Sequence, residues 1–327
     1  MSKAVRFHKL GGPEVLQIEE VPVRHPETGE VAIDVAAVGL NRAESMYYRG
    51  NYSQQPEFPS GLGYEVVGTV TAVGEGVDSS LIGKRIGTIP IYSMNRYPVL
   101  GERAIVPAEA VAELPPSLSS VEGAAVWMQY PTAYGALVEF AKVGPGDTVL
   151  LTAASSSVGL AAIQIVKAQG AISIATTRTS SKKQLLLDFG ADHVIATQEE
   201  DLPARVREIT GGKLARVAFD AIGGSYIDTL AQAVAPEGTI YLYGLLSEEA
   251  NNYPVSAFFK AISLTGYMMY QMKTPERFEP MKRYVYEHLV NGSFRPRVDR
   301  TFPFEQAADA YRYLESNQQV GKVVITL

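Results

Sequence analysis

The chain has 327 residues, of which 46% are hydrophobic and 20% charged, and it contains no cysteine. At roughly 150 residues per domain, this length predicts two domains, and the composition is that of a globular protein rather than a disordered or fibrous one. Twenty-nine lysines and arginines against 35 acidic residues give a formal charge of −6, which argues against a nucleic-acid partner. The lack of cysteine excludes disulfides, a thiol nucleophile and cysteine-ligated metals.

The apolar runs of the chain are too short to cross a membrane. Charged residues interrupt each run well before the roughly 20 apolar residues that a span needs, and the opening MSKAVRFHKLGGPE has no signal-peptide core. We therefore expect a soluble, cytoplasmic protein with no membrane partner. The four histidines, at positions 8, 25, 193 and 288, are scattered without metal-ligand spacing, so we also expect no metal site.

The first third of the chain has the alternation of β-strands. Residues 30–39 (EVAIDVAAVG) and 66–73 (VVGTVTAV) alternate apolar with polar or small residues at period two. Between them, PSGLGYE (59–65) is too rich in glycine for the interior of an element, and we expect a loop there. Residues 89–103 form a second turn-rich stretch.

From about residue 121, short apolar runs alternate with amphipathic stretches of helical length. We predict strands at 148–153, 171–177, 193–197, 217–222 and 239–245, with helices at 159–170, 182–189, 202–209 and 226–235. This alternation predicts a doubly wound parallel sheet with helices on both faces, an α/β fold. Helices at 275–291 and 304–317 and a strand at 322–327 complete the chain.

A dinucleotide fingerprint is partly preserved after the first parallel strand. In TAASSSVGL (152–160) the three glycine positions of G-x-G-x-x-G fall on Ala154, Ser156 and Gly159, with Ser157 and Val158 between the last two. A pyrophosphate at a helix N-terminus needs small side chains and free backbone N–H groups, and this turn offers both. The alternative is an ordinary βα turn with helix-capping serines.

The next strand end favours NADPH over NADH. An NAD enzyme places an acidic residue about 20 positions after the fingerprint to accept from the ribose 2′-hydroxyl. Here Arg178 stands 19 positions after Gly159, within TRTSSKK (177–183), where Thr177 and Lys182 supply further donors and no carboxylate occurs. Such a segment suits a 2′-phosphate. The alternative is a solvated basic turn at a helix start.

The whole chain resembles the zinc-independent quinone oxidoreductase (zeta-crystallin-like) branch of the medium-chain dehydrogenase/reductase superfamily. The motifs that carry the resemblance are GGPEVL (11–16), VGLNRAE (38–44), PSGLGYEVVGTVTAVGEGV (59–77), GDTVLLTAASSSVGLAAIQIVKAQGA (146–171) and FDAIGG (219–224). The resemblance implies a GroES-like β domain of residues 1–120 and 268–327. It also implies a Rossmann-type dinucleotide-binding domain of residues 121–267, with the active site in the cleft.

Two residue types depart from the metal-using relatives. Asn41 stands where those enzymes have a cysteine, and Tyr64 stands where they have a histidine. Without a Lewis acid, a substrate that already carries an electrophile is easier to reduce than an alcohol is to oxidise. The resemblance thus implies NADPH-dependent reduction of quinones or α,β-unsaturated carbonyls by hydride transfer, without metal. The alternatives are an enoyl-thioester reductase and a non-catalytic, crystallin-like NADPH-binding protein.

The resemblance also assigns roles around the substrate. It implies that Asn41 donates a hydrogen bond near the nicotinamide, and that Tyr64 faces the cleft, where it either donates to the substrate or fills the space of the lost ligand. Tyr47 and Tyr52 lie in the segment that resembles the substrate loop of the family. The tyrosine that a relative places near the nicotinamide falls on Met46 here.

Further cofactor contacts and the oligomer follow from the same resemblance. It implies that Thr132, Tyr243, Leu245 and Asn317 contact the cofactor, with ordinary packing as the alternative for each. Relatives pair their nucleotide-binding sheets across a dimer axis at the strand corresponding to residues 263–269, so we expect a homodimer.

Overall fold

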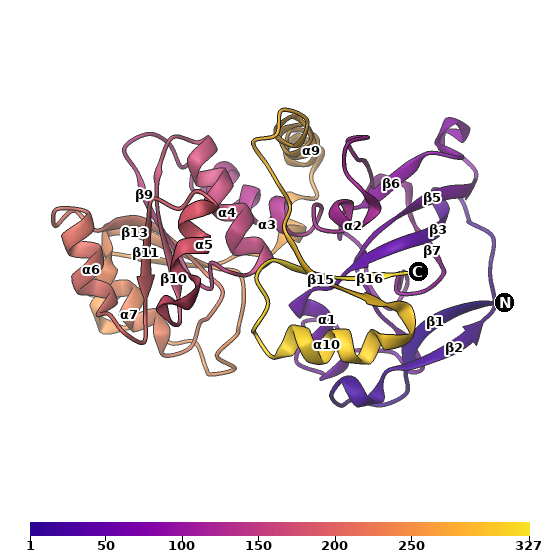
Figure 1. The fold of residues 1–327 in the computed structure, drawn as a ribbon, viewed down its shortest axis with the longest axis horizontal. Coiled ribbons are helices and arrows are strands. Elements are labelled where there is room, and N and C mark those ends of the chain that lie inside the picture. Colours follow the sequence, from indigo (N-terminus) through magenta and orange to yellow (C-terminus); the bar gives the residue numbers. More distant parts are fainter. The chain divides into compact units, whose positions relative to one another are not determined.

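The computed structural model describes residues 1–327, which form two compact units (Figure 1). The β unit comprises Met1–Met128 and Tyr286–Leu327, and the α/β unit comprises Gln129–Val285. We expected divisions after residues 120 and 267; the units divide after Met128 and within helix α9 (Pro275–Val290).

The β unit is built on a seven-stranded sheet around strand β3 (Glu30–Gly39), which has the predicted bounds. The strand order is β15-β16-β3-β5-β6-β8, and β7 also pairs with β3. The C-terminal strand β16 runs antiparallel to β3, so that the last residues of the chain lie beside the first third. The remaining strands are β5 (Glu65–Val73), β6 (Arg85–Thr88), β7 (Arg103–Pro107), β8 (Val111–Glu113), β15 (Val298–Pro303) and β16 (Lys322–Thr326).

A small second sheet in the same unit has no counterpart in the sequence predictions. It has the order β2-β1-β4, where β1 is Ser2–Phe7, β2 is Gln17–Val21 and β4 is Ser60–Gly61. The helices of the unit are short, apart from the shared α9: α1 (Arg42–Tyr48), α2 (Ser120–Gly123) and α10 (Ala307–Glu315). Strand β4 pairs antiparallel with β1, so two residues of the glycine-rich segment 59–65, which we expected to be a loop throughout, form a short strand.

The α/β unit contains the predicted parallel sheet, with six strands in the order β11-β10-β9-β12-β13-β14. All five pairings are parallel. Counted along the chain this is the order 3-2-1-4-5-6 of dinucleotide-binding folds, whose direction reverses between β9 and β12. The strands are β9 (Thr148–Leu151), β10 (Ile172–Thr177), β11 (His193–Ala196), β12 (Ala215–Asp220), β13 (Val234–Leu242) and β14 (Ser263–Gly266).

Helices connect these strands, and the apolar side chains between sheet and helices form the core. Leu150, Ile174, Ile195, Val206 and Ile240 are among its fully buried members. The helices are α3 (Gln129–Tyr134), α4 (Ser157–Ala168), α5 (Lys183–Asp188), α6 (Leu202–Ile209), α7 (Tyr226–Ala233) and α8 (Val255–Phe259). None of the helices in the chain combines the length and hydrophobicity needed to cross a membrane.

Glu30, at the start of β3, is a buried carboxylate held most closely by Arg24, with Arg96 Nη2 farther away at 3.6 Å. Arg24 Nη1 lies 2.5 Å from Glu30 Oε2 and Arg24 Nη2 lies 3.1 Å from Oε1. Glu27 N and the Tyr97 hydroxyl also donate to this carboxylate, at 2.9 and 3.0 Å. Hydrogen bonding to Arg24, more than any other contact, lowers the pKa of Glu30 to about 2.

This contact predicts a pH-dependent stability. Because the folded-state pKa of Glu30 lies below the usual 4.5, its contribution is present above pH 4.5 and is lost as the pH falls toward 2. Glu30→Gln is expected to cost on the order of 2 kcal/mol of unfolding free energy at pH 7, discounted because Arg24 is partly exposed, and much less at pH 3. Urea unfolding at both pH values measures this difference, with the exposed Glu113→Gln as control; an equal loss at pH 7 and pH 3 contradicts it.

Candidate functional site

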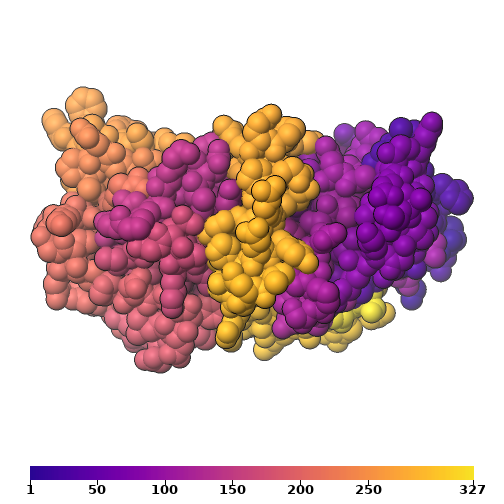
Figure 2. Space-filling view, turned by 90° about the horizontal axis from the view of Figure 1, so that it is seen from above, coloured from indigo at the N-terminus to yellow at the C-terminus, as the bar shows by residue number.

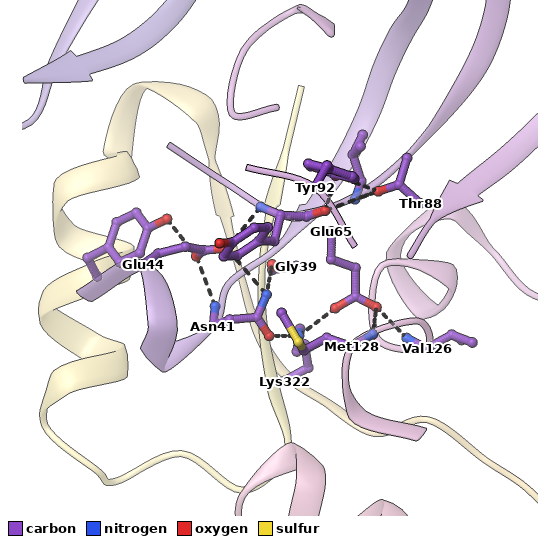
Figure 3. Close-up of polar contacts among 12 residues, drawn as sticks. Gly39, Asn41, Glu44, Glu65, Thr88, Tyr92, Val126, Met128 and Lys322 are labelled. Carbon is purple, nitrogen blue, oxygen red and sulfur yellow. Dashed lines mark hydrogen bonds and ion pairs between the residues drawn. The ribbon is translucent and has the colours of Figure 1, made fainter. Parts of the chain in front are cut away.

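A buried ammonium group joins three strands of the β unit. Lys322 begins β16, and its Nζ lies 2.6 Å from Glu65 Oε2 at the start of β5 and 2.6 Å from Asn41 Oδ1 just after β3 (Figure 3). The lysine side chain has no solvent exposure. A Cβ on Gly39 would come within 2.7 Å of Lys322 Cε and 1.9 Å of Ala124 O, so the glycine leaves room for the lysine stem.

The Glu65 carboxylate is held at both oxygens. Its Oε1 accepts from the backbone N–H groups of Val126 and Met128, at 2.9 and 3.1 Å, while Oε2 faces Lys322. A buried ion pair offsets its desolvation cost only when further hydrogen bonds satisfy the remaining lone pairs. Here those bonds come from the segment after α2.

Glu44 is a second buried carboxylate and accepts four hydrogen bonds. The donors are Asn41 N at 2.9 Å, Asn41 Nδ2 at 3.3 Å, Tyr64 N at 3.1 Å and the Tyr311 hydroxyl at 2.8 Å. Burial raises the pKa of Glu44, and these hydrogen bonds oppose the rise. We call Asn41, Glu44, Glu65, Tyr311 and Lys322 the Lys322 cluster.

The structure engages all polar atoms of the Asn41 side chain. Nδ2 donates to Gly39 O at 3.0 Å and to Glu44 Oε1, while Oδ1 accepts from Lys322. Asn41 is 8% exposed and begins helix α1 as its N-cap. Its predicted donation to a substrate oxygen therefore requires that one of these bonds be exchanged.

Two of the three predicted site tyrosines contact each other. Tyr64 is 2% exposed, its carbonyl accepts from Thr88 Oγ1 at 3.2 Å and from the Tyr92 hydroxyl, and its ring centroid lies 6.4 Å from that of Tyr52. Tyr47 instead lies in the core, edge-on to Phe7.

The Tyr47 hydroxyl is also engaged within the fold. It bonds to Ser60 Oγ at 2.7 Å and donates to Asn95 Oδ1. The Tyr47 side chain is therefore fully buried and its hydroxyl is satisfied within the β unit.

The predicted fingerprint turn follows β9 in the α/β unit. Ser156 is the N-cap of α4, and its Oγ accepts from Gly159 N at 3.1 Å. A Cβ on Gly159 would lie 2.5 Å from Ala154 Cα, so the first turn of the helix packs directly on the loop. Ser157 and Val158 form the start of the helix.

The fold brings the basic segment after β10 to this turn. Lys182 Nζ lies 3.5 Å from Ser155 Oγ, a serine that the sequence analysis did not single out. Thr177 is 8% exposed at the end of β10, and Arg178 is exposed beyond it. The two predicted cofactor segments are therefore in contact.

The expectation that no carboxylate lies at this segment is wrong. Glu199 Oε1 accepts from Ser180 N at 2.9 Å and from Ser180 Oγ at 3.3 Å. Glu199 follows β11, and the parallel pairing of β10 with β11 brings it beside the basic segment. The segment 177–183 alone could not predict this contact, because Glu199 lies 16 positions beyond its end.

Asp220 ties together the ends of β9 and β12. It is fully buried and accepts from Thr152 Oγ1 at 2.6 Å, Ile222 N at 3.0 Å and Gly223 N at 2.9 Å. Burial raises the pKa of Asp220. The carboxylate thereby fixes two loops at the carboxyl edge of the parallel sheet, next to the point where its strand order reverses.

The other predicted cofactor residues are distributed over both units. Tyr243 follows β13 and stacks on Phe219 with centroids 3.9 Å apart, and Leu245 beyond it is 41% exposed. Thr132 lies in α3 and is 9% exposed. Asn317 belongs to the β unit, where its Oδ1 accepts from Arg42.

His, Asp and Glu side chains do not form any group of three or more that could hold a metal ion, and the chain has no cysteine. Glu44 and Glu65, the buried acids of the Lys322 cluster, are instead satisfied by hydrogen-bond donors and by the lysine ammonium.

The Lys322 cluster predicts a large stability effect. Lys322→Met leaves Glu65 buried without its cation and is expected to cost about 3–5 kcal/mol of unfolding free energy. Adding Glu65→Gln removes the uncompensated charge, so the double variant should recover part of the loss. Urea unfolding of the single and double variants is the measurement, and a loss below about 1 kcal/mol in Lys322→Met would show that the pair is not essential.

Two family models match successive parts of the chain. Residues 27–152 match the family described as "Alcohol dehydrogenase GroES-like domain", and residues 157–285 match "Zinc-binding dehydrogenase". Quinone oxidoreductase 1 of Escherichia coli strain K12 is 31% identical, with 99% of each chain covered. The human protein named quinone oxidoreductase is 28% identical over 100% of this chain and 98% of its own.

Solved structures of relatives have the same fold over the whole chain. The Escherichia coli quinone oxidoreductase described as complexed with NADPH superimposes with a TM-score of 0.92 at 30% identity, covering 99% of this chain and 100% of that one. The chain therefore belongs to the quinone oxidoreductase (zeta-crystallin-like) branch of the medium-chain dehydrogenase/reductase superfamily.

Proposed function

We propose that this protein is an NADPH-dependent oxidoreductase that reduces quinones or α,β-unsaturated carbonyls by hydride transfer, without a metal. Full-length relatives carry the name quinone oxidoreductase, and one solved relative is described as complexed with NADPH. Membership of the family alone does not settle the reaction, so the residues of this chain must fit it.

The observation that carries the proposal is the meeting of the basic segment with the fingerprint turn. Arg178 and Lys182 follow β10, and Lys182 reaches Ser155 in the turn between β9 and α4. Ligands of doubly wound sheets bind at the carboxyl ends of the strands where the strand order reverses, which is beside β9 here. This edge therefore presents cations at the position where the adenosine 2′-phosphate would lie.

The turn itself fits a pyrophosphate. Ala154 and Gly159 keep the approach to the start of α4 free of large side chains, and Ser156 fixes the helix start. Helix α4 has 12 residues, and its first N–H groups point toward the turn. When bound, NADPH supplies the hydride; the residues of this unit bind and orient it.

The donor set of the β unit supports a reaction without metal. An amide and a phenol, Asn41 and Tyr64, are poor replacements for the thiolate and imidazole ligands that bind zinc. The Asn41 oxygen is also occupied by the Lys322 ammonium. Substrates that already carry an electrophilic carbon suit such a site.

The cofactor assignment predicts the effect of removing one guanidinium. Arg178→Ala is expected to weaken NADPH binding by about 2–3 kcal/mol, as the loss of a charged hydrogen bond does, and to leave NADH binding unchanged. Fluorescence titration of both cofactors, together with cofactor oxidation by a panel of quinones, enals and enones, measures this. Lys213→Ala, an exposed basic residue in the same unit, is the control. Equal use of NADH and NADPH by the wild-type protein refutes the assignment.

We further propose that the protein is a cytoplasmic homodimer. Strand β14 is the edge of the parallel sheet and is largely exposed. Val255, Phe258 and Phe259 on the neighbouring helix α8 are 69%, 68% and 81% exposed, and Figure 2 shows orange atoms of this part of the chain at the surface of the α/β unit. An unpaired edge beside exposed apolar side chains is suited to pairing with a second copy.

The dimer can be measured directly. Sedimentation should give about twice the 35.4 kDa mass of the chain. Replacing Phe258 and Phe259 together by glutamate should shift the protein to monomers, because two desolvated charges oppose association. A wild-type monomer at micromolar concentration counts against the proposal, and Leu187→Glu on α5, where the side chain is 40% exposed, serves as a control for added surface charge.

A further inference from the structure

Glu199 is placed where a second anion, the cofactor 2′-phosphate, would have to bind. Strand β11 pairs in parallel with β10, and beyond the strands Thr197 N donates to Thr177 O and Gln198 N donates to Arg178 O, at 2.9 and 3.0 Å. These bonds hold the segment after β11 beside the basic segment. Glu199 therefore reaches Ser180, between Arg178 and Lys182 in sequence.

One oxygen of the Glu199 carboxylate occupies two donors. Its Oε1 accepts from the Ser180 N–H at 2.9 Å and from the Ser180 hydroxyl at 3.3 Å. A backbone N–H and a serine hydroxyl next to an arginine are the donors that a phosphate monoester recruits. Carboxylate and phosphate would thus compete for the same groups and would also repel each other.

The neighbouring acid shows that this arrangement is particular to Glu199. Glu200 is paired with Lys183 at 2.5 Å and with Arg205 at 3.1 Å, so its charge is compensated. The hydrogen-bond partners of Glu199 are the uncharged groups of Ser180. Its negative charge is therefore not compensated by an ion pair, and it lowers the positive potential at the basic segment.

We propose that Glu199 is a specificity-determining residue that weakens binding of the 2′-phosphate and so reduces the preference for NADPH that Arg178 creates. The inference rests on the proposed function and deepens it. In NADH the ribose carries a 2′-hydroxyl, which donates to a carboxylate, whereas in NADPH the same position carries a phosphate dianion. Arg178 and Glu199 thus act on the cofactor ratio in opposite directions.

The test uses Glu199→Gln, which keeps an oxygen acceptor for Ser180 and removes the charge. Calorimetric titration with 2′,5′-ADP and 5′-AMP reports the phosphate alone, and fluorescence titration with NADPH and NADH reports the whole cofactor. We expect 2′,5′-ADP and NADPH to bind roughly tenfold more tightly to the variant at low ionic strength, with 5′-AMP and NADH unchanged or weaker. Because the groups are exposed, the gain should shrink as salt is added.

The matched control is Glu237→Gln, which makes the same change of charge in the first half of β13, on the amino side of the parallel sheet. Glu199→Ala is the second variant, and it should show the same direction of change as Glu199→Gln. A ratio of 2′,5′-ADP to 5′-AMP affinity that equals that of the wild type in both Glu199 variants overturns this proposal alone. Failure of the wild-type protein to bind any of the four ligands overturns the cofactor assignment as well.

Discussion

The architecture of the β unit depends on one buried cation. Lys322 lies in the last strand, yet its ammonium joins Glu65 and Asn41, which are more than 250 positions earlier in the chain. Removing an ammonium from water is so costly that burial is tolerated only where acceptors of good geometry meet it. The fold therefore brings β16, the end of β3 and the start of β5 to one point, where the side-chain contacts of Lys322 add to the backbone pairing of β16 with β3.

The same contacts determine how freely the proposed substrate residues can move. Asn41 is held by Lys322, Gly39 and Glu44, and the Tyr64 backbone is held by Glu44 on its N–H side and by Thr88 and Tyr92 on its carbonyl side. Side chains fixed by several bonds reorganise little on binding, which favours a pre-formed arrangement over one that forms around the substrate. Asn41 and Tyr64 stand where metal-using relatives have zinc ligands. In this chain hydrogen bonds hold both residues in place, and those of Asn41 include one from the ammonium of the Lys322–Glu65 ion pair.

The local sequence pattern predicted most of the α/β unit, because each strand and each helix buries apolar side chains that recur with the period of that element. Helix 202–209 and strand 30–39 have the predicted bounds, whereas β13 begins at Val234 and not at 239, since Pro236, Glu237 and Gly238 interrupt the apolar run that marks a strand. The fingerprint turn and Arg178 were predictable for the same local reason. The pairs Lys322–Glu65 and Glu199–Ser180 were not, because topology alone brings these residues together; a lysine between Gly321 and the apolar VVIT was the one available signal.

The two kinds of electrostatic contact in this chain differ in how easily they can be altered. The Lys322 cluster is buried, so removing any one charge leaves another without compensation, and the cluster can change only if its members change together. Arg178 and Glu199 are exposed, and single substitutions there alter the local potential at little cost to the fold. A preference between cofactors that is built from exposed charges around a rigid turn can therefore shift by single substitutions, while the buried cluster and the parallel sheet stay unchanged.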